Sequence, residues 1–416
     1  MSRPARRALA AMAVAIGLMG AHSAAAAGPP AHSAAAAGPP ALGVRAAALI
    51  EESTGQPLYG VNQNAELAIA STTKLMTALV TLHHAQLRDV FTDPDLVWPA
   101  QDSQIGLEPG ERMSVRDLMI AMLLPSADDA AEDLAYNVGH GSVARFEAMM
   151  NARARELGLT HTHYTTPIGL DTPGNYSSAE DLVRLARYLL RSEPFVRAVV
   201  AKPSAVLRSG NHVRHVVNLN DLVARDRWID GVKTGHTLQA GYVLVASGTQ
   251  GPPTQRMTLI GAVMGTASEA ARDANALALL DWGFANFRLR TPVHAGQLLA
   301  RVPVKSAAPG RLARLIAAGS YTHVFPRSTR VHVRVRVPAE LTGPLPADAV
   351  VGTALVMAGS RVQARIPLEL AAALPQIRVS KGLKKVVVLS VTLSGLVLAA
   401  GAAIGLRMFW RESTRG

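Results

Sequence analysis

The sequence predicts an α+β fold in which a mainly antiparallel sheet surrounds a helical insert, and a smaller β-rich domain follows. Three observations predict this fold class. Strand-like segments stand on both sides of a stretch with helical periodicity, the last third of the chain alternates between apolar and charged residues, and a 21-residue run without charge lies near the end. A chain of 416 residues is long enough for two or more domains with full cores.

The first 43 residues predict export and a linker. Arginines precede an apolar run, Ala8–Met19, and small residues follow it. This arrangement is typical of a cleaved signal peptide, which we assign to residues 1–27. The decapeptide at 21–30 recurs unchanged at 31–40, so we assign residues 28–43 to a low-complexity linker that arose by duplication.

Residues 44–290 are expected to form the α+β domain. A hairpin at 44–60 leads into a helical stretch that runs to about residue 200, interrupted by an irregular loop at Thr160–Tyr176. The period then changes to that of short strands. The expected helices are Ser114–Leu124, Ala127–Val138, Ser142–Leu157, Ala179–Arg191 and Ala270–Phe287, and the expected late strands are Asp230–Thr234, Gly241–Ser247 and Met257–Gly265.

The C-terminal part predicts a β-rich domain and a membrane anchor. Residues 291–376 alternate in strand period, most clearly at Arg330–Val337, where valines share one face and charges the other. The charge-free run 386–406 is long enough to span a bilayer as a transmembrane helix. Because the N-terminus predicts export, residues 407–416 are expected in the cytoplasm, and the chain is expected to be a single-pass protein of the cell membrane with its main domain outside.

Composition argues against two classes of partner. The formal charge of +12 invites a nucleic-acid partner, but the arginines are scattered, with no basic run interleaved with aromatics, so we predict no such partner. An exported basic protein near anionic envelope polymers accounts for the charge. The chain has no cysteine, and the pairs His83-His84 and His161-x-His163 bring no obvious third ligand. We therefore predict neither a metal nor a cofactor.

The stretch Ala70–Ala78 carries the first candidate chemistry. Ser71 and Lys74 lie three residues apart on one helix face, so the serine hydroxyl can pass its proton to the lysine amine. The chain has seven lysines against 35 arginines, and this is its only Ser-x-x-Lys. Arginine cannot lose its proton in a protein, so a buried lysine is the group that can act as a base. Such a tetrad alone is more often a solvated helix face, and the later motifs decide between the two interpretations.

Two further stretches fit a site organised by this serine. Ser126 begins a Ser-x-Asp sequence that ends at Asp128, and a hydroxyl there could relay a proton to a leaving amine. Lys233 and Thr234 offer a cation and a hydroxyl to a substrate carboxylate. Gly235 is expected to let the substrate backbone come close.

In this order the three motifs resemble the active-site set of penicillin-binding proteins and serine β-lactamases. The detail resembles the low-molecular-mass D-alanyl-D-alanine carboxypeptidases over about Val44 to Phe287, and the resemblance implies a DD-peptidase/β-lactamase-like domain there. The later β-rich domain and anchor match the family's layout without sequence motifs. The stretches that carry the resemblance are Ala70–Ala78, Gly106–Glu111, Leu123–Ser126, Asp230–Thr237 and Ala240–Tyr242.

The resemblance implies acyl transfer on a peptidoglycan stem peptide. Ser71 would attack the carbonyl of the penultimate D-alanine and release the terminal one, and water would then hydrolyse the acyl-enzyme. It implies that Lys74 is the base and that Ser126 passes the proton to the departing amine. It also implies that β-lactams inhibit the reaction.

The resemblance assigns the remaining substrate contacts as well. Lys233 and Thr234 would hold the terminal carboxylate. The backbone N–H groups of Ser71 and His236 would form the oxyanion hole, where charge develops in the transition state. Arg272, near the start of the last helix of the domain, would add a second contact to the carboxylate.

Asp128 departs from the family pattern, which usually has asparagine at this position. An ionised carboxylate only accepts hydrogen bonds, and its charge near Lys74 favours the protonated, non-basic amine. Either Asp128 is protonated in a desolvated site, or it is paired with a lysine and leaves the geometry intact. We predict that Asp128→Asn retains or raises turnover.

Two alternatives to a carboxypeptidase stay open. A class A β-lactamase needs a glutamate that activates the deacylating water. No convincing Glu-x-x-Leu-Asn-like stretch lies between Ser126 and Lys233, and an appended β-domain with an anchor suits a wall enzyme better. The other alternative is a catalytically silent wall-binding protein in which Asp128 marks a decayed site.

Overall fold

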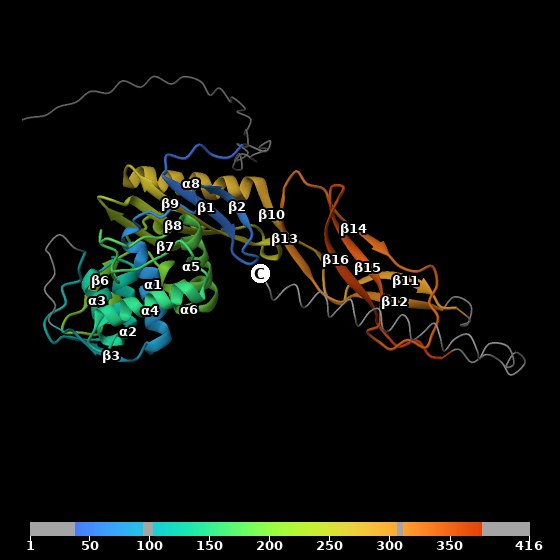
Figure 1. Ribbon diagram of the computed structural model, residues 1–416, viewed down its shortest axis with the longest axis horizontal. Coiled ribbons are helices and arrows are strands. Elements are labelled where there is room, and N and C mark those ends of the chain that lie inside the picture. Colours follow the sequence, from blue (N-terminus) through green and yellow to red (C-terminus); the bar gives the residue numbers. More distant parts are fainter. Residues whose placement is uncertain (1–37, 95–102, 306–310, 377–416) are drawn as a thin grey trace, which may run out of the picture. The chain divides into compact units, whose positions relative to one another are not determined.

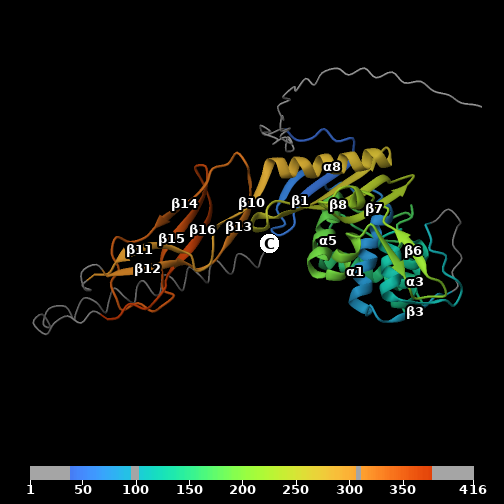
Figure 2. The ribbon, with the colours of Figure 1, turned by 180° about the vertical axis from the view of Figure 1, so that it is seen from behind.

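The computed structural model describes residues 38–94, 103–305 and 311–376 (Figure 1). A five-stranded sheet has the order β2-β1-β9-β8-β7, and each pair of neighbours is antiparallel. Helix α8 covers one face of this sheet, and the helical insert that includes α1 and α5 covers the other (Figures 1 and 2). This part of the chain is therefore a three-layer α+β domain.

The elements of the three-layer domain follow one another as a hairpin, a helical insert, late strands and a final helix. The hairpin is β1 (Ala46–Glu51) and β2 (Pro57–Val61). The insert holds the 3-10 turn η1 (Ala70–Thr73), α1 (Lys74–His84), β3 (Val90–Thr92), β4 (Arg112–Ser114), α2 (Val115–Leu123), α3 (Asp128–Val138), α4 (Val143–Glu156), α5 (Ala179–Ser192), α6 (Pro194–Val200), β5 (Ser204–Leu207), β6 (Arg214–Val217) and α7 (Leu222–Arg225). The domain ends with β7 (Ile229–Thr237), β8 (Gly241–Gln250), the turn η2 (Pro253–Gln255), β9 (Met257–Thr266) and α8 (Glu269–Asn286).

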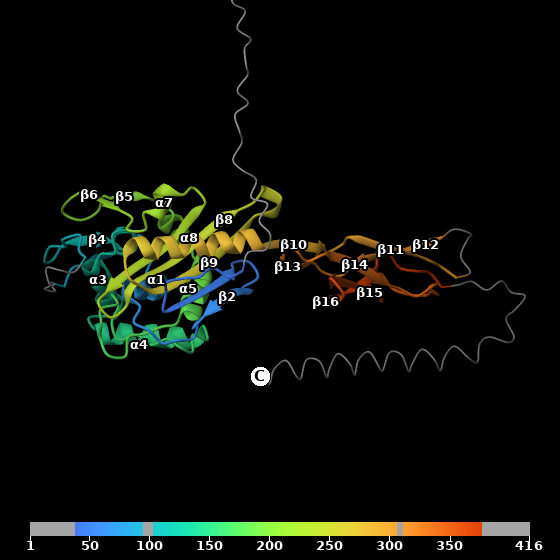
Figure 3. The same ribbon diagram turned by 90° about the horizontal axis from the view of Figure 1, so that it is seen from above.

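Side-chain alternation explains how the sheet serves two cores. Successive side chains of a strand point to opposite faces. In β1, Ala46, Ala48 and Ile50 therefore pack in the core shared with the helical insert, whereas Ala47 and Leu49 pack in the core under α8. All six residues of β1 are buried, which fits a strand covered on both faces. Figure 3, seen from above, shows α8 lying along the sheet next to β9.

A second set of strands builds a separate apolar core. The paired strands β10 and β13 accompany a five-stranded sheet of order β11-β12-β16-β15-β14, in which β11 and β14 are the edges. Val302, Leu315 and Val356 lie in the core of this set. Its strands are β10 (Phe287–Val293), β11 (Leu298–Pro303), β12 (Leu312–Ala317), β13 (Tyr321–Pro326), β14 (Val331–Arg336), β15 (Val350–Ala358) and β16 (Arg361–Leu370).

The structure confirms the expected hairpin, all five expected helices and the three late strands, with shifts of a few residues at their ends. The sequence did not predict the short strand pairs β3–β4 and β5–β6, the short helix α7 or the turn η2. Two further differences concern the nucleophile turn and α6. The turn that carries Ser71 is a 3-10 turn rather than the first turn of an α-helix. The short helix α6 begins at Pro194 and is rich in valine, a pattern that in seven residues does not distinguish a helix from a strand.

Several predictions fall on residues outside the described part of the chain. These are the signal peptide at 1–27, most of the linker at 28–43, the transmembrane helix at 386–406 and the tail at 407–416. In the part that is described, no helix is long and apolar enough to span a bilayer. The assigned limits of the domains, including the boundary at 290, stay a prediction.

Candidate active site

The nucleophile candidate lies where a 3-10 turn meets a buried helix. Ser71 is in η1 and is partly exposed, and Lys74 begins α1 and is fully buried. The apolar residues that follow Lys74 hold the helix in the core, so its first turn is fixed. The Lys74 amine donates to Ser71 Oγ at 2.9 Å. Sequence spacing predicted this contact.

The Lys74 amine also contacts two side chains from a distant segment. Ser126 Oγ lies 3.4 Å from Lys74 Nζ, and Asp128 Oδ1 forms an ion pair with it. A protonated amine has three N–H donors, which matches these three acceptors. Burial lowers the pKa of Lys74 below its ordinary value, whereas the charge and hydrogen bond of Asp128 oppose this shift. Burial thus favours the neutral Lys74 amine, whereas Asp128 favours the protonated one.

Ser126 joins the two lysines. It follows helix α2 in a left-handed backbone conformation, with φ +66°, and is 4% exposed. Its Oγ accepts from Lys233 Nζ at 2.9 Å. Burial, followed by the charge of Lys74, lowers the pKa of Lys233 well below its ordinary value. The hydroxyl thus connects the general-base candidate to the expected carboxylate-binding cation.

Strand β7 reaches this site because Gly235 has no side chain. A Cβ at Gly235 would lie 2.9 Å from Ala70 Cβ, 3.0 Å from the Ser71 backbone nitrogen and 3.1 Å from the Ile69 carbonyl oxygen. Real Cβ atoms essentially never come closer than the first of these distances. The missing Cβ makes room for the chain's own nucleophile segment, which the sequence did not predict. The expected close approach of a substrate backbone stays a prediction.

The remaining predicted site residues surround this centre with different exposure. Thr234 is buried, and its carbonyl accepts from Lys233 Nζ at 2.9 Å. His236 is exposed, and its ring stacks on Tyr242 with centroids 4.0 Å apart. Arg272 is 3% exposed and is tied to Asp273 and Glu269, yet its charge still acts on Lys233. Its expected contact with the substrate stays a prediction.

The loop Thr160–Tyr176 supports the nucleophile turn from the other side. A Cβ at Gly169, where φ is +95°, would lie 2.0 Å from the Ala70 carbonyl oxygen. Thr77 donates to the Pro167 carbonyl at 2.5 Å, and Asn175 reaches Thr73 Oγ1 at 3.4 Å. The sequence predicted an irregular loop here but gave no sign of this contact.

Asp129, the neighbour of Asp128, holds a further loop against the site. Its carboxylate accepts from the backbone N–H groups of Ile105, Gly106 and Leu107, at 2.9 to 3.2 Å. The Asp128 N–H donates to the Ser103 carbonyl at 2.6 Å. The wall of the site that contains Ser126 and Asp128 is thus fixed by the loop after residue 102.

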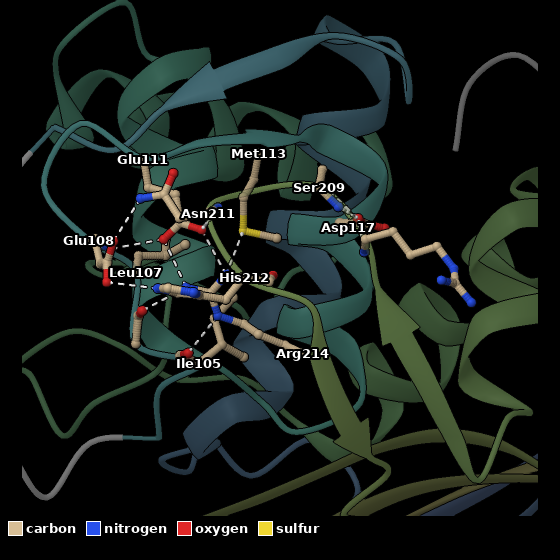
Figure 4. Close-up of polar contacts among 12 residues, drawn as sticks. Ile105, Leu107, Glu108, Glu111, Met113, Asp117, Ser209, Asn211, His212 and Arg214 are labelled. Carbon is tan, nitrogen blue, oxygen red and sulfur yellow. Dashed lines mark hydrogen bonds and ion pairs between the residues drawn. The ribbon is translucent and has the colours of Figure 1, made fainter.

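A buried ion pair holds the far end of this loop (Figure 4). Arg214 donates to both carboxylate oxygens of Glu111, at 2.7 and 2.8 Å, and to the carbonyls of Ile105 and Gly106. The Glu111 side chain is fully buried. Bidentate pairs of this kind fix geometry as well as charge. Sequence reasoning missed Asp129, Glu111 and Arg214 as supports, because their partners are distant along the chain.

Asp128 is paired with a lysine, which is one of the two arrangements expected from the sequence, and the lysine is the general-base candidate Lys74. We therefore expect the activity of Asp128→Asn to be retained or raised and its rise with pH to begin at lower pH. The Asp128 carboxylate raises the pKa of Lys74, so its loss lowers that pKa and makes the neutral amine available at lower pH. The measurement is kcat/KM for D-alanine release against pH.

The control for this substitution is Asp348→Asn, which removes the same charge at an exposed position in a left-handed conformation that asparagine tolerates. Its profile should match the parent. A large fall in the activity of Asp128→Asn would show that the carboxylate has a role of its own.

In the described ranges 38–94, 103–305 and 311–376, no group of three or more histidine, cysteine or acidic side chains is placed to hold a metal ion.

Comparison with known proteins agrees with this geometry. The family model described as D-alanyl-D-alanine carboxypeptidase, peptidase family S11, matches residues 33–268. D-alanyl-D-alanine carboxypeptidase DacA of Escherichia coli K12 is 33% identical over 321 residues, which cover 73% of this chain and 77% of that protein. DacF of Bacillus subtilis is 34% identical over 266 residues, which cover 63% of this chain and 67% of that protein.

Solved structures extend the similarity to the three-dimensional fold. Penicillin-binding protein 5 of Haemophilus influenzae matches with a TM-score of 0.65 at 28% identity, covering 81% of this chain and 99% of its own. The Streptomyces K15 DD-transpeptidase matches with a TM-score of 0.56 at 31% identity, covering 60% of this chain and 100% of its own. With its three motifs meeting at one site, the chain belongs to the D-alanyl-D-alanine carboxypeptidase family of serine peptidases.

Proposed function

We propose that this chain is a serine-type D-Ala-D-Ala carboxypeptidase that removes the terminal D-alanine of peptidoglycan stem peptides through an acyl-enzyme on Ser71. The observation that carries the proposal is an unbroken series of contacts from Ser71 through Lys74 and Ser126 to Lys233. Membership of the family supports the reaction class.

Acylation begins when Ser71 Oγ attacks the carbonyl carbon of the penultimate D-alanine. The hydroxyl proton passes to neutral Lys74 Nζ, 2.9 Å away, and the carbonyl π electrons move to the oxygen. Burial supports this step, because it lowers the pKa of the lysine and favours the neutral amine. The N–H groups of Ser71 and His236 stabilise the oxyanion.

The tetrahedral intermediate collapses by breaking the bond to the terminal D-alanine nitrogen. Ser126 Oγ gives its proton to that nitrogen and regains one from the protonated Lys74 amine; the hydroxyl lies between the Lys74 and Lys233 amines, at 3.4 and 2.9 Å. Lys233 and Thr234 hold the carboxylate of the leaving residue. Water then attacks the ester carbonyl and gives a proton to Lys74 Nζ. The bond from the carbonyl carbon to Ser71 Oγ breaks, and Lys74 returns the proton to Ser71.

The same reaction with a β-lactam opens the ring and leaves the drug on Ser71. The name of penicillin-binding protein 5 from Haemophilus influenzae supports this second substrate class for the present chain. We further propose export by the segment 1–27 and anchoring by 386–406, on the sequence grounds given above. The catalytic domain then works outside the cytoplasmic membrane.

The test combines covalent labelling with turnover. Full-length protein in detergent is treated with penicillin and digested, and mass spectrometry locates the adduct. We expect one penicillin mass on the peptide that contains Ser71, none on the peptide that contains Ser126, and release of D-alanine from a peptide ending in D-Ala-D-Ala.

Heat-unfolded protein is the control for non-specific acylation, because it keeps every serine but loses the site. Labelling of Ser71 without D-alanine release would favour the silent wall-binding protein. Rapid loss of the adduct with release of hydrolysed penicillin would favour a β-lactamase. An adduct on another residue would contradict the proposed nucleophile.

A further inference from the structure

A basic groove is lined by residues that lie outside the acyl-transfer motifs. Its volume is about 540 Å³, and it is lined by the turn before β9, by β10 and by β14. Three arginines and two histidines contribute to it: Arg256, Arg288, Arg290, His294 and His332. Among the described residues that line the groove, none is acidic.

The central arginines carry their charge without a carboxylate. Arg288 and Arg290 are two residues apart on β10, so their side chains leave the same face of the strand. Within the described part of the chain, neither arginine forms an ion pair, whereas Arg214 forms one with Glu111. Partial burial and the neighbouring charge of Arg288 lower the pKa of Arg290. An anion would relieve this repulsion.

The groove also holds buried polar atoms that have no partner among the described residues. Arg288 Nε and His332 Nδ1 are buried, and within residues 38–94, 103–305 and 311–376 neither has a hydrogen-bond partner. One Arg288 terminal nitrogen is anchored by the Arg327 carbonyl at 2.8 Å, which holds the guanidinium in place. Buried polar groups normally have a hydrogen-bond partner. These two nitrogen atoms can therefore form hydrogen bonds with a ligand in the groove.

We propose that this groove binds a phosphate group through Arg288 and Arg290. Guanidinium groups match the oxygens of phosphate with paired hydrogen bonds and stay charged at every physiological pH. Two arginines and nearby histidines suit an anion of more than one charge better than a single carboxylate. Leu289, Pro292 and Val333 give the same groove an apolar wall.

The phosphate can come from two sources, free phosphate or the headgroup of an acidic lipid. The apolar wall and the volume leave room for the glycerol portion of a headgroup, and a protein of net charge +12 is drawn to an anionic surface. Both sources use the same contacts with the arginines. They differ in whether the phosphate must be presented on a membrane.

The experiment uses full-length protein in detergent and two probes. Inorganic phosphate is titrated by calorimetry, and a second titration uses micelles of the same detergent that contain phosphatidylglycerol or, as the control lipid, phosphatidylcholine. The variant is Arg290→Gln, because this side chain makes no hydrogen bond in the described structure. The matched control is Arg301→Gln, which removes one positive charge from an exposed position on β11.

We expect Arg290→Gln to weaken phosphate binding by about tenfold or more, as for a lost hydrogen bond to a charged group, and Arg301→Gln to leave it unchanged. D-alanine release should be the same in both, which shows that they are folded. Binding of phosphatidylglycerol micelles, but not of phosphatidylcholine micelles, that inorganic phosphate competes away assigns the lipid headgroup. Binding of inorganic phosphate alone assigns the free ion.

Two results would overturn the site. The first is an equal loss of binding in Arg290→Gln and Arg301→Gln, since attraction to the general positive charge of the protein predicts no difference between them. The second is failure of the parent protein to bind inorganic phosphate or phosphatidylglycerol at low salt, where charge interactions are least screened. Neither result bears on the acyl-transfer reaction, which is measured separately.

Discussion

Lys74→Met should lose both activity and stability. Loss of the general base is expected to slow acylation by a factor of about 10² to 10⁴. The substitution also leaves the Asp128 carboxylate, which is 6% exposed, without its ion-pair partner. Removing one partner of a buried pair costs about 3 to 5 kcal/mol of unfolding free energy. Penicillin acylation and urea unfolding measure the two effects.

The double variant Lys74→Met with Asp128→Asn separates the two effects. Because asparagine carries no charge, the double variant should recover much of the unfolding free energy that Lys74→Met lost. Acylation should stay slow, since the amine is still missing. Recovery of acylation together with stability would mean that Lys74 acts only through structure, and that another group is the base.

Gly235→Ala should impair catalysis through backbone displacement. The added Cβ would meet Ala70 Cβ at 2.9 Å and the Ser71 nitrogen at 3.0 Å, so β7 and the nucleophile turn must separate. A displacement of about 1 Å at a reacting group can cost a factor of about 10² in rate. We expect a fall of this size in kcat/KM for D-alanine release, with the oxyanion-hole N–H groups pulled apart.

Gly319→Ala is the matched control, because a Cβ there has no atom within 4 Å and φ is not in the left-handed region. It should keep full activity. The thermal midpoints of both variants report whether the loss at Gly235 is local. Parent-like activity in Gly235→Ala would contradict the tight apposition of β7 and the nucleophile turn.

The sequence predicted the contacts that depend on local spacing. Ser71 and Lys74 are three residues apart, and any helical or 3-10 turn brings their side chains to one side. The late strands and α8 were predicted for the same reason, since the apolar period is a local signal. The convergence of Ser126 and Lys233 with Lys74 was expected from the resemblance of the motifs to a known family.

The sequence could not predict contacts that only the packed chain creates. Nothing near Asp128 says which lysine it pairs with, and only the assembled site brings Lys74 rather than Lys233 to its carboxylate. The ion pair between Glu111 and Arg214 joins residues about a hundred positions apart. The sequence also could not show that Arg288 and Arg290 on β10 form no ion pair within the described ranges, because a strand pattern does not report missing counter-charges.

Two glycine-containing segments pack closely against the nucleophile turn from different sides. Gly169, in the loop Thr160–Tyr176, lies close to the Ala70 carbonyl, and Gly235, in β7, lies close to Ala70 and to the Ser71 backbone nitrogen. The reactive alcohol is therefore seated by the tertiary arrangement of the domain rather than by its own helix. A fragment that carries the Ser-x-x-Lys tetrad but lacks either glycine segment has no means to aim the hydroxyl.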